Sequence, residues 1–314
     1  MTFELTILGS SSALPTSKRF PTAHLLNVNE RFFLIDCGEG TQVQLRRFGL
    51  SPARINHIFI SHLHGDHVFG LFGLISTFGL MGRKADLNIY GPPALEELLE
   101  THLRFFGPLP FPLKFNTPTG PLPAVIYEDS RITVTALELK HRTPTLGYLF
   151  REKDRLLNVR KDRIGELGVG VADIMRIKKG EDYTTADGRM IPNKELTLPA
   201  WHSRSYAYLS DTKFTPSLVP YIRGVDLLFH EATFMEKDLK LARETWHSTA
   251  REAALMAEQA GAGRLLIGHF SSRYKDLEEL IGEARTVFPE TSDVNDGDRF
   301  SLPLTRVSTE VDKP

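Results

Sequence analysis

The stretch His62-Leu63-His64-Gly65-Asp66-His67 places three imidazoles and one carboxylate within six residues. It follows the apolar run 58–61, a pattern that predicts a loop leaving the end of a buried strand. Burying such groups without partners would cost about 1–3 kcal/mol for each. A bound metal would satisfy them, so the stretch predicts a metal site. A chance histidine cluster on a surface loop is the alternative.

The spacing within this stretch favours two ions. His62 and His64 alternate along an extended backbone and could reach one ion, whereas Asp66 and His67 point elsewhere and could hold a second. A zinc ion takes about four ligands, and a catalytic site keeps one position open. Two ions that share a bridging carboxylate therefore need three more protein ligands.

Candidates for these three ligands lie downstream, each shortly after an apolar, strand-like run. Strand ends that meet at one edge of a sheet are where α/β proteins place their sites. This supply of ligands disfavours the chance cluster. The candidates are His141 after 133–139, Asp211 after 206–210, and His269 after 265–268.

Two further basic residues are candidates for work on a substrate. His247 lies two residues before Thr249-Ala250-Arg251-Glu252, a capping box that predicts the start of a helix running to Ala260. It is either an ordinary surface residue or a proton donor near the positive end of that helix. Arg273 follows His269 by four residues and would suit a phosphate group.

Composition indicates the class of chain that must carry these residues. The 314 residues are 41% hydrophobic, enough for a large core, and the net charge of −1 neither favours nor excludes a polyanionic partner. The single cysteine, Cys37, excludes an internal disulfide framework and suits a reducing compartment. Without a leader-like segment or a membrane-spanning stretch, we expect a cytoplasmic protein with no membrane partner.

The predicted elements alternate between strands and helices. Strands are expected at 3–8, 24–28 and 32–36, then helices at 68–80 and 94–106, and later the strands that deliver the candidate ligands. His24 and His57 stand alone in strand-like runs, so core positions are expected for both. The last segment, 290–314, carries 6 acidic against 3 basic residues and is expected to be a loosely attached tail.

Residues 151–200 differ from the rest of the chain. They show little sustained periodicity and carry 11 Lys and Arg against 9 Asp and Glu, a net charge of +2. A segment of this length without a clear core pattern is uncommon inside a compact domain and is usually functional. A solvated insertion without a function is the alternative.

Taken together, the motifs resemble ribonuclease Z, the tRNA 3′-processing endonuclease family of the metallo-β-lactamase superfamily. The resemblance covers residues 3 to about 288 and implies an αββα sandwich, two zinc ions per chain, a homodimer, and a protruding arm that grips precursor tRNA. We match that arm to 151–200, inserted in a single domain spanning 1–314. The motifs are His62 to His67, His141, Ser210-Asp211-Thr212, His230-Glu231-Ala232-Thr233, His247-Ser248-Thr249, the run from His269 to Tyr274, and the run from Asp36 to Gln42.

Two departures from the family pattern stand out. The family's N-terminal loop often has the form Pro-x-Lys-x-Arg-Asn, whereas here Pro15-Thr16-Ser17-Lys18-Arg19-Phe20 displaces the lysine and lacks the asparagine. Arg19 keeps its spacing and stays a candidate for substrate binding. The family's arm commonly has a Gly-Pro turn, and 168–173 has no proline.

The resemblance implies hydrolysis of an RNA phosphodiester after the acceptor stem. Two zinc ions roughly 3.5–4 Å apart would activate a shared water. Asp66 would also orient the attacking group, and His247 would protonate the leaving oxygen. The implied ligand sets are His62, His64 and His141 for one ion, Asp66, His67 and His269 for the other, and Asp211 as the bridge.

Three other interpretations stay open on the residues. A hydrolase of the same fold acting on a small phosphodiester or thioester would share all the ligands but would not need the arm. A non-catalytic RNA-binding protein would not need an open metal position. A β-lactamase would normally be secreted.

Overall fold

The computed structural model describes residues 1–14, 16–105 and 107–307. The chain divides into two compact units, one formed by 1–151 with 205–302 and the other by 152–204 with the C-terminal residues from 303. The larger unit carries every metal-ligand candidate.

The first sheet of the larger unit has seven strands in the order β18-β1-β2-β3-β4-β5-β6. The strands β1, β2 and β3 are antiparallel neighbours, and β3 to β6 run parallel. Parallel strands send their carboxyl ends to one edge, so the chain leaving β4 brings His62 there. The bounds are β1 Phe3–Gly9, β2 Ala23–Val28, β3 Arg31–Ile35, β4 Ile55–Phe59, β5 Leu87–Tyr90, β6 Leu113–Asn116 and β18 Arg299–Ser301.

The second sheet also has seven strands, in the order β17-β16-β15-β14-β9-β8-β7. Its parallel strands β14, β15 and β16 end next to Asp211, Glu231 and His269, which places these residues at the same edge. The bounds are β7 Ala124–Glu128, β8 Ile132–Leu139, β9 Thr145–Glu152, β14 Ser205–Leu209, β15 Leu227–Glu231, β16 Arg264–Gly268 and β17 Thr291–Asp293.

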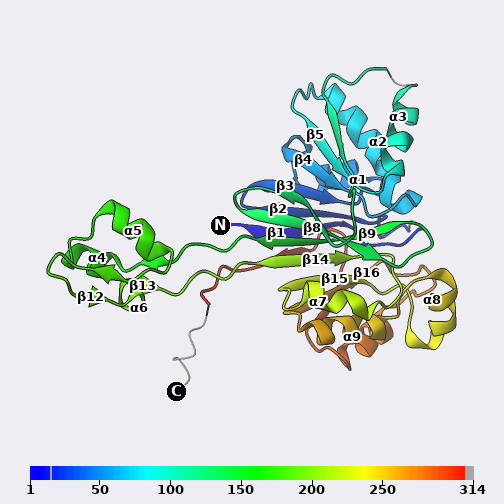
Figure 1. Cartoon of the computed structure of the whole chain (residues 1–314). Coiled ribbons are helices and arrows are strands. Elements are labelled where there is room, and N and C mark those ends of the chain that lie inside the picture. Colours follow the sequence, from blue (N-terminus) through cyan, green and yellow to red (C-terminus); the bar gives the residue numbers. More distant parts are fainter. Residues whose placement is uncertain (15, 106, 308–314) are drawn as a thin grey trace. The chain divides into compact units, whose positions relative to one another are not determined.

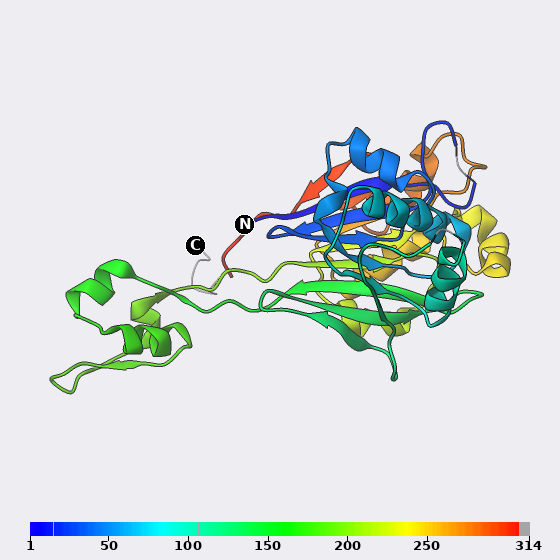
Figure 2. The ribbon, with the colours of Figure 1, turned by 90° about the horizontal axis from the view of Figure 1, so that it is seen from above.

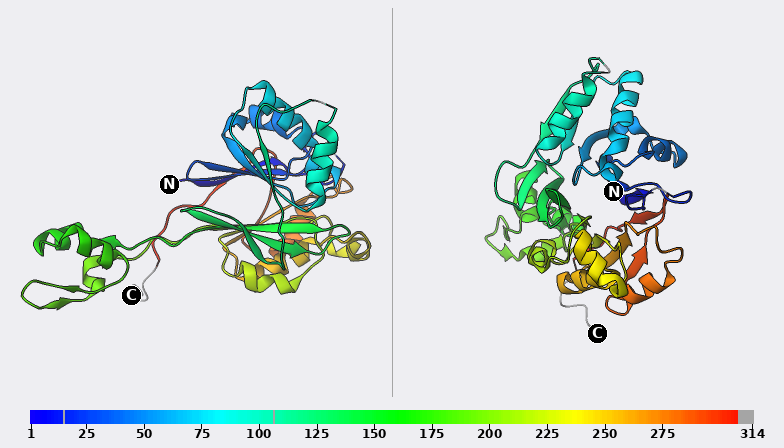
Figure 3. Two further views of the ribbon diagram at one scale, coloured as in Figure 1. Left: turned by 45° about the horizontal axis from the view of Figure 1, so that its top comes forward. Right: turned by 90° about the vertical axis from the view of Figure 1, so that its right-hand side faces the viewer.

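The two sheets pack face to face, and helices cover their outer faces (Figures 1 and 3). Aromatic residues dominate the layer between the sheets, where the Phe59 and Tyr90 rings stack at 4.3 Å. This arrangement confirms the predicted αββα sandwich. The longer helices are α1 Thr41–Arg47, α2 Gly65–Leu80 and α3 Ala94–Leu103 against the first sheet, and α8 Leu239–Thr245, α9 Ala250–Ala260 and α10 Glu278–Arg285 on the side of the second.

Two sequence predictions about local structure are confirmed. The predicted capping box at the start of α9 is present: the Thr249 side chain accepts from the Glu252 backbone N–H, and the Glu252 side chain accepts from the Thr249 backbone. The predicted core position is confirmed for His24, which is buried, whereas His57 is half-buried; their Nδ1 atoms lie 2.8 and 3.3 Å from tyrosine hydroxyls.

The prediction of a loose C-terminal tail was wrong for 290–302. Strand β17 pairs with β16. Strand β18, the red arrow in Figure 2, pairs with the blue N-terminal strand β1. The Asp296 carboxylate accepts hydrogen bonds from Ser10 Oγ, Phe20 N and Gln44 Nε2. An acidic segment can be ordered in this way because its carboxylates satisfy buried donors of the N-terminal loop. Residues 308–314 lie outside the described part of the chain.

The smaller unit is folded around a core of its own, which the weak periodicity of its sequence did not predict. Ile164, Val169, Ile177 and Leu196 are its buried apolar residues. They come from short elements, so no single window shows a pattern. The elements are β10 Asn158–Val159, α4 Lys161–Glu166, α5 Val171–Lys178, β11 Tyr183–Thr184, β12 Met190–Ile191, α6 Asn193–Leu196 and β13 Thr197–Leu198.

Among the described residues, no helix is long and apolar enough to cross a lipid bilayer.

Candidate metal centre

The central histidine stretch is part loop and part helix. His62 and His64 lie in the loop after β4, whereas Asp66 and His67 belong to the first turn of α2, which begins at Gly65. The prediction of a loop throughout was therefore wrong. The change from extended backbone to helix is what directs the two pairs of side chains to different places, because a helix turns successive side chains by about 100°.

Close backbone contacts hold the start of α2 in place. Cys37 N donates to His67 O at 2.8 Å, and Gly70 N donates to Cys37 O at 2.9 Å. A Cβ added to Gly70 would lie 2.0 Å from Gly38 O, and one added to Gly38 would lie 2.5 Å from Asp66 O. Both positions therefore require glycine for the first turn of α2 to reach the site.

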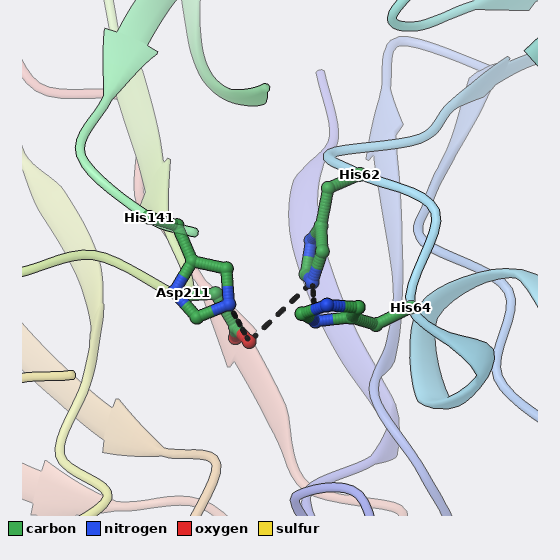
Figure 4. A group of neighbouring side chains, drawn as sticks. All are labelled: His62, His64, His141 and Asp211. Atoms are coloured by element: carbon green, nitrogen blue, oxygen red, sulfur yellow. Dashed lines mark hydrogen bonds and ion pairs between the residues drawn. The ribbon is translucent and has the colours of Figure 1, made fainter. Parts of the chain in front are cut away.

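Asp211 lies between two groups of ligand candidates, and each of its oxygens faces one group. Oδ2 is 3.5 Å from His62 Nε2 and 3.7 Å from His141 Nε2. Oδ1 is 3.4 Å from His67 Nε2 and 3.2 Å from His269 Nε2. A carboxylate in this position can bridge two cations. Figure 4 shows the first group, in which His64 Nδ1 also approaches His62 Nε2 to 2.9 Å.

The positions of the candidate ligand atoms fit bound metal ions. The ligand atoms of His62, His64, His141 and Asp211 lie within 4.8 Å of one another, as do those of Asp66, His67 and His269. Nε2 of His67 and of His141 is buried without a hydrogen-bond partner among the described residues. Buried polar atoms are normally paired, so these two nitrogens indicate a missing ligand.

The protonation states of the histidines also favour metal binding. Burial lowers the pKa of His62, His64 and His141, which keeps them in the neutral form that binds metals. His67 is the exception: burial opposes its protonation, but three nearby carboxylates raise its pKa well above the usual value. A bound cation would neutralise these carboxylates in place of that proton.

Hydrogen bonds from the opposite ring nitrogens fix how the histidines face the centre. His67 Nδ1 donates to Asp36 Oδ2 at 2.7 Å, and His269 Nδ1 donates to Thr233 Oγ1 at 2.9 Å. His141 Nδ1 donates to the Trp246 carbonyl at 3.0 Å. In each case Nε2 is left facing the centre, the arrangement typical of metal-binding histidines.

Asp36 is a site residue to which the sequence analysis assigned no role. Its Oδ2 accepts from His67, from Ser61 Oγ at 2.8 Å and from Tyr208 Oη at 2.5 Å, while Oδ1 accepts from Ser61 N at 2.7 Å. The available signal was an acidic residue at the end of an apolar strand followed by Cys-Gly. Because four donors satisfy this buried carboxylate, it can hold His67 rigidly.

Several residues of the centre have a backbone conformation that L-residues rarely adopt. The φ angles are +55° at Asp36, +54° at Asp211, +60° at His269 and +64° at Trp246. Each such residue costs on the order of 1–3 kcal/mol, and such residues cluster at functional sites. Asp211 and His269 are ligand candidates, and Asp36 and Trp246 orient other candidates. Backbone strain at these four positions indicates that they are held for a functional role.

His247 lies beside this centre and pairs with Glu231. Its Nδ1 is 2.8 Å from Glu231 Oε1. Burial would lower the His247 pKa, but the charge of Glu231 and this hydrogen bond raise it to about 9. The carboxylate of Glu231 therefore outweighs burial in its effect on the His247 pKa. Glu231 is held by the backbone N–H groups of Thr212, Thr233 and Ser248.

A cavity of about 340 Å³ opens beside these side chains. Its walls bring together residues from the N-terminal loop, both ligand groups and the segment around His247. Its lining includes Leu14, His64, Asp66, His141, Arg142, Asp211, Phe234, Thr245, His247 and His269.

The two predicted substrate-binding arginines lie outside this cavity and already have partners. Arg19 donates to Asn295 Oδ1 at 2.8 Å and lies over the Phe270 ring at 5.1 Å, in the wall of a separate cavity of about 780 Å³. Arg273 is 3.5 Å from Asp238 Oδ1 and lies over the Phe234 ring. Pro15, in the same loop as Arg19, lies outside the described residues.

A two-sheet sandwich flanked by helices, with histidines and aspartates gathered at one sheet edge, defines a metallo-β-lactamase-fold protein. Consistently, the family model described as Beta-lactamase superfamily domain matches residues 196–270, and the one described as Anti-Pycsar protein Apyc1 matches 3–105.

Relatives identify the particular family. The chain is 51% identical over 290 residues to ribonuclease Z of Bacteroides fragilis, covering 92% of this chain and 95% of that one. It is 48% identical to ribonuclease Z of Porphyromonas gingivalis, covering 96% and 99%. The crystal structure of the short form of human tRNase Z superposes with a TM-score of 0.69 at 28% identity, covering 96% and 99%. The chain belongs to the ribonuclease Z family.

Proposed function

We propose that this chain is a zinc-dependent endoribonuclease that removes the 3′ trailer from precursor tRNA. The tRNA keeps a 3′-hydroxyl, and the trailer leaves with a 5′-phosphate. One observation carries the proposal beyond family membership: two donor groups share Asp211, and a carboxylate-paired histidine stands beside them. A binding protein would need neither.

Seven residues would hold the ions, in the two sets that flank Asp211. Imidazoles and carboxylates without a thiolate suit zinc, and manganese could occupy the same site. When bound, two such ions would act as Lewis acids toward the phosphate and lower the pKa of a water between them. The sets are His62, His64 and His141, and Asp66, His67 and His269, with Asp211 common to both.

The chain's own residues would then manage the proton movements. Asp66, in the cavity wall, would orient the attacking water in line with the bond that breaks. As the new P–O bond forms, the bond from phosphorus to the tRNA 3′-oxygen breaks. His247, protonated through its pairing with Glu231, would donate its proton to that leaving oxygen. Attack and departure at phosphorus then yield the two ends named above.

A cleavage assay on precursor tRNA tests the proposed function. We expect a single cut at the 3′ side of the acceptor stem, loss of cleavage after dialysis against a chelator, and recovery when Zn²⁺ is added back. Cleavage that persists without bound metal, or failure to cut precursor tRNA with about two metal ions bound, would contradict the proposal.

We propose further that the smaller unit, which includes the predicted arm 151–200, binds the tRNA body through backbone phosphates. Several of its arginines are engaged: Arg163 with Glu166, and Arg189 with Asp187. Lys161, Lys179 and Lys194 are exposed and form no ion pair among the described residues. These lysines would supply contacts that depend on charge and shape rather than on base sequence.

Removing this unit should weaken tRNA binding while sparing the chemistry. A short Gly-Ser turn in place of 156–198 would keep the backbone bond from Glu152 N to Arg204 O at 2.9 Å. We expect a higher Kd for precursor tRNA and a flatter dependence of log Kd on log salt, because fewer counterions are released. Hydrolysis of a small chromogenic phosphodiester should persist.

Charge substitutions provide a matched comparison for the deletion. Changing Lys161, Lys179 and Lys194 to Gln should reproduce part of the change in salt dependence. Changing the exposed Lys84 and Lys240 of the larger unit to Gln should not. Equal loss of tRNA cleavage and small-substrate hydrolysis in the deletion would mean that the unit is structural.

We also propose that the protein works as a homodimer in the cytoplasm. Large apolar side chains are exposed on α1 and at both ends of α2: Val43 at 55%, Phe69 at 62% and Leu80 at 87%. Exposed apolar side chains of this size on a helical face would be covered at a protein interface. Light scattering should give a mass near twice 35.4 kDa. The single buried cysteine suits a reducing compartment.

A further inference from the structure

Trp246 occupies an unusual position beside the metal centre. It ends helix α8 in the left-handed conformation, with a φ of +64°, and its carbonyl accepts the hydrogen bond that orients His141. Left-handed backbone is unfavourable for an L-residue with a large side chain, and glycine or asparagine would provide the same carbonyl at lower cost. The carbonyl therefore explains the backbone conformation but not the choice of tryptophan.

The indole ring is not explained by core packing either. The residue is 37% exposed, the only tryptophan among the large exposed apolar side chains of the described chain. Thr245 and His247, on either side of it in sequence, both line the catalytic cavity, whereas Trp246 is not part of the cavity lining. The ring is therefore a partly exposed group outside the cavity lining, on a residue between two that line it.

One cation lies over the ring, and a second is bonded to the helix that ends at Trp246. Lys213 Nζ lies 3.9 Å from the centre of the indole ring, on a residue two positions after Asp211. Arg142, next to His141, lines the cavity and donates from Nη2 to the Glu244 carbonyl at the end of α8. Lys213, Arg142 and Trp246 each lie within two residues of a site residue in sequence. The loops that carry the site residues therefore also position these three side chains.

We propose that Trp246, Lys213 and Arg142 form a nucleotide subsite flanking the scissile phosphate. An unpaired base next to the cleavage point would stack on the indole ring, and the two cations would contact the adjoining phosphates. Single-stranded nucleic acid is commonly bound by this combination of an aromatic platform and positive charge. The subsite rests on the proposed RNA substrate, and it places the unpaired end of the acceptor region at the His141 side of the cavity.

Tryptophan fluorescence can report on this subsite directly. The chain has two tryptophans, so Trp201→Phe leaves Trp246 as the only one. In this background, a short single-stranded RNA should quench the fluorescence with a saturable curve. An oligomer of the same length with abasic sugars should quench it weakly. Absence of quenching at concentrations where the RNA is shown to bind by anisotropy would overturn the stacking.

Substitutions separate the ring from the backbone carbonyl. Trp246→Leu should weaken binding of the short RNA by roughly 5- to 100-fold, the usual range for loss of one base stack. Trp246→Phe should restore most of the affinity, since a phenyl ring also stacks. Lys213→Ala should weaken the RNA and the abasic oligomer alike and reduce the salt dependence. Tyr221→Leu, which removes an exposed ring from the short helix α7 (Val219–Ile222), provides the matched control and should bind like the parent.

The outcomes distinguish this subsite from the proposed function. Equal RNA affinity in the parent, Trp246→Leu and Trp246→Phe would refute the subsite while precursor tRNA cleavage by the parent still supports the function. Loss of bound zinc in Trp246→Leu, without rescue by Trp246→Phe, would reassign the tryptophan to support of His141. Failure of the parent to cleave precursor tRNA would count against the function itself.

Discussion

Replacing His247 with alanine should lower kcat for precursor tRNA by about 10²- to 10⁴-fold, the usual contribution of general acid–base catalysis. The reason is geometric: His247 lines the cavity and its Nδ1 is paired with Glu231, which leaves Nε2 to serve the leaving oxygen. Single-turnover cleavage measures the effect on the chemical step. Zinc content and tRNA affinity should stay near those of the parent.

A substrate with a good leaving group provides the control for this interpretation. A nitrophenolate needs little protonation as it departs, so hydrolysis of a nitrophenyl phosphodiester should suffer far less from His247→Ala. His247 also lies near Asp211 and His269 with a ligand atom available. If both substrates were affected equally and zinc were lost, His247 would be a metal ligand rather than the acid.

The Glu231 pairing makes a further part of this prediction measurable through pH. Burial opposes protonation of His247, and Glu231 overcomes it, so the histidine has a raised pKa and is protonated at neutral pH. A general acid works while it is protonated, so its activity persists up to its pKa and falls at higher pH as the proton is lost. Glu231→Gln removes the charge and should move the alkaline limb of the pH–rate profile to lower pH. An unmoved limb would show that another group is the acid.

Replacing Asp211 with alanine should lower the bound metal from about two ions per chain and abolish cleavage of both precursor tRNA and the small phosphodiester. Its two oxygens face both ligand groups, within 3.7 Å of four histidine nitrogens. Removing the bridge therefore weakens both positions and leaves the imidazoles without a compensating charge. Elemental analysis of protein purified without chelator measures the result.

The matched variant for this test is Asp226→Ala. Asp226 directly precedes β15, and its carboxylate accepts hydrogen bonds from Ser205 N and Oγ instead of facing the ligand candidates. We expect it to retain its metal, although its stability should fall through loss of those hydrogen bonds. Two ions still bound in Asp211→Ala, or a single ion in the parent protein, would refute the shared bridge.

The sequence alone was sufficient to predict the class of fold and which histidines and aspartates come together at one edge of the sheets. Metal ligands are chemically distinctive, and His62, His64, Asp66 and His67 are so close in sequence that few other roles fit them. His141, Asp211 and His269 were identifiable because each follows an apolar strand, and strand ends in such sheets meet at one edge. These signals lie in short stretches of the sequence and can be recognised without knowledge of the fold.

The tertiary structure decided what depends on contacts between distant residues. Asp36, after β3, reaches His67 on α2, and Glu231, at the end of β15, reaches His247 between α8 and α9, only because the fold packs these helices against the strand ends. No local pattern records such a pairing, since a buried acid in a strand can have many partners. The same limit applies to Arg19 and Arg273: no local pattern showed that they would contact Asn295 and Asp238, and their binding to substrate stays a prediction. Residue type shows what a side chain can do, whereas its neighbours in space determine what it does.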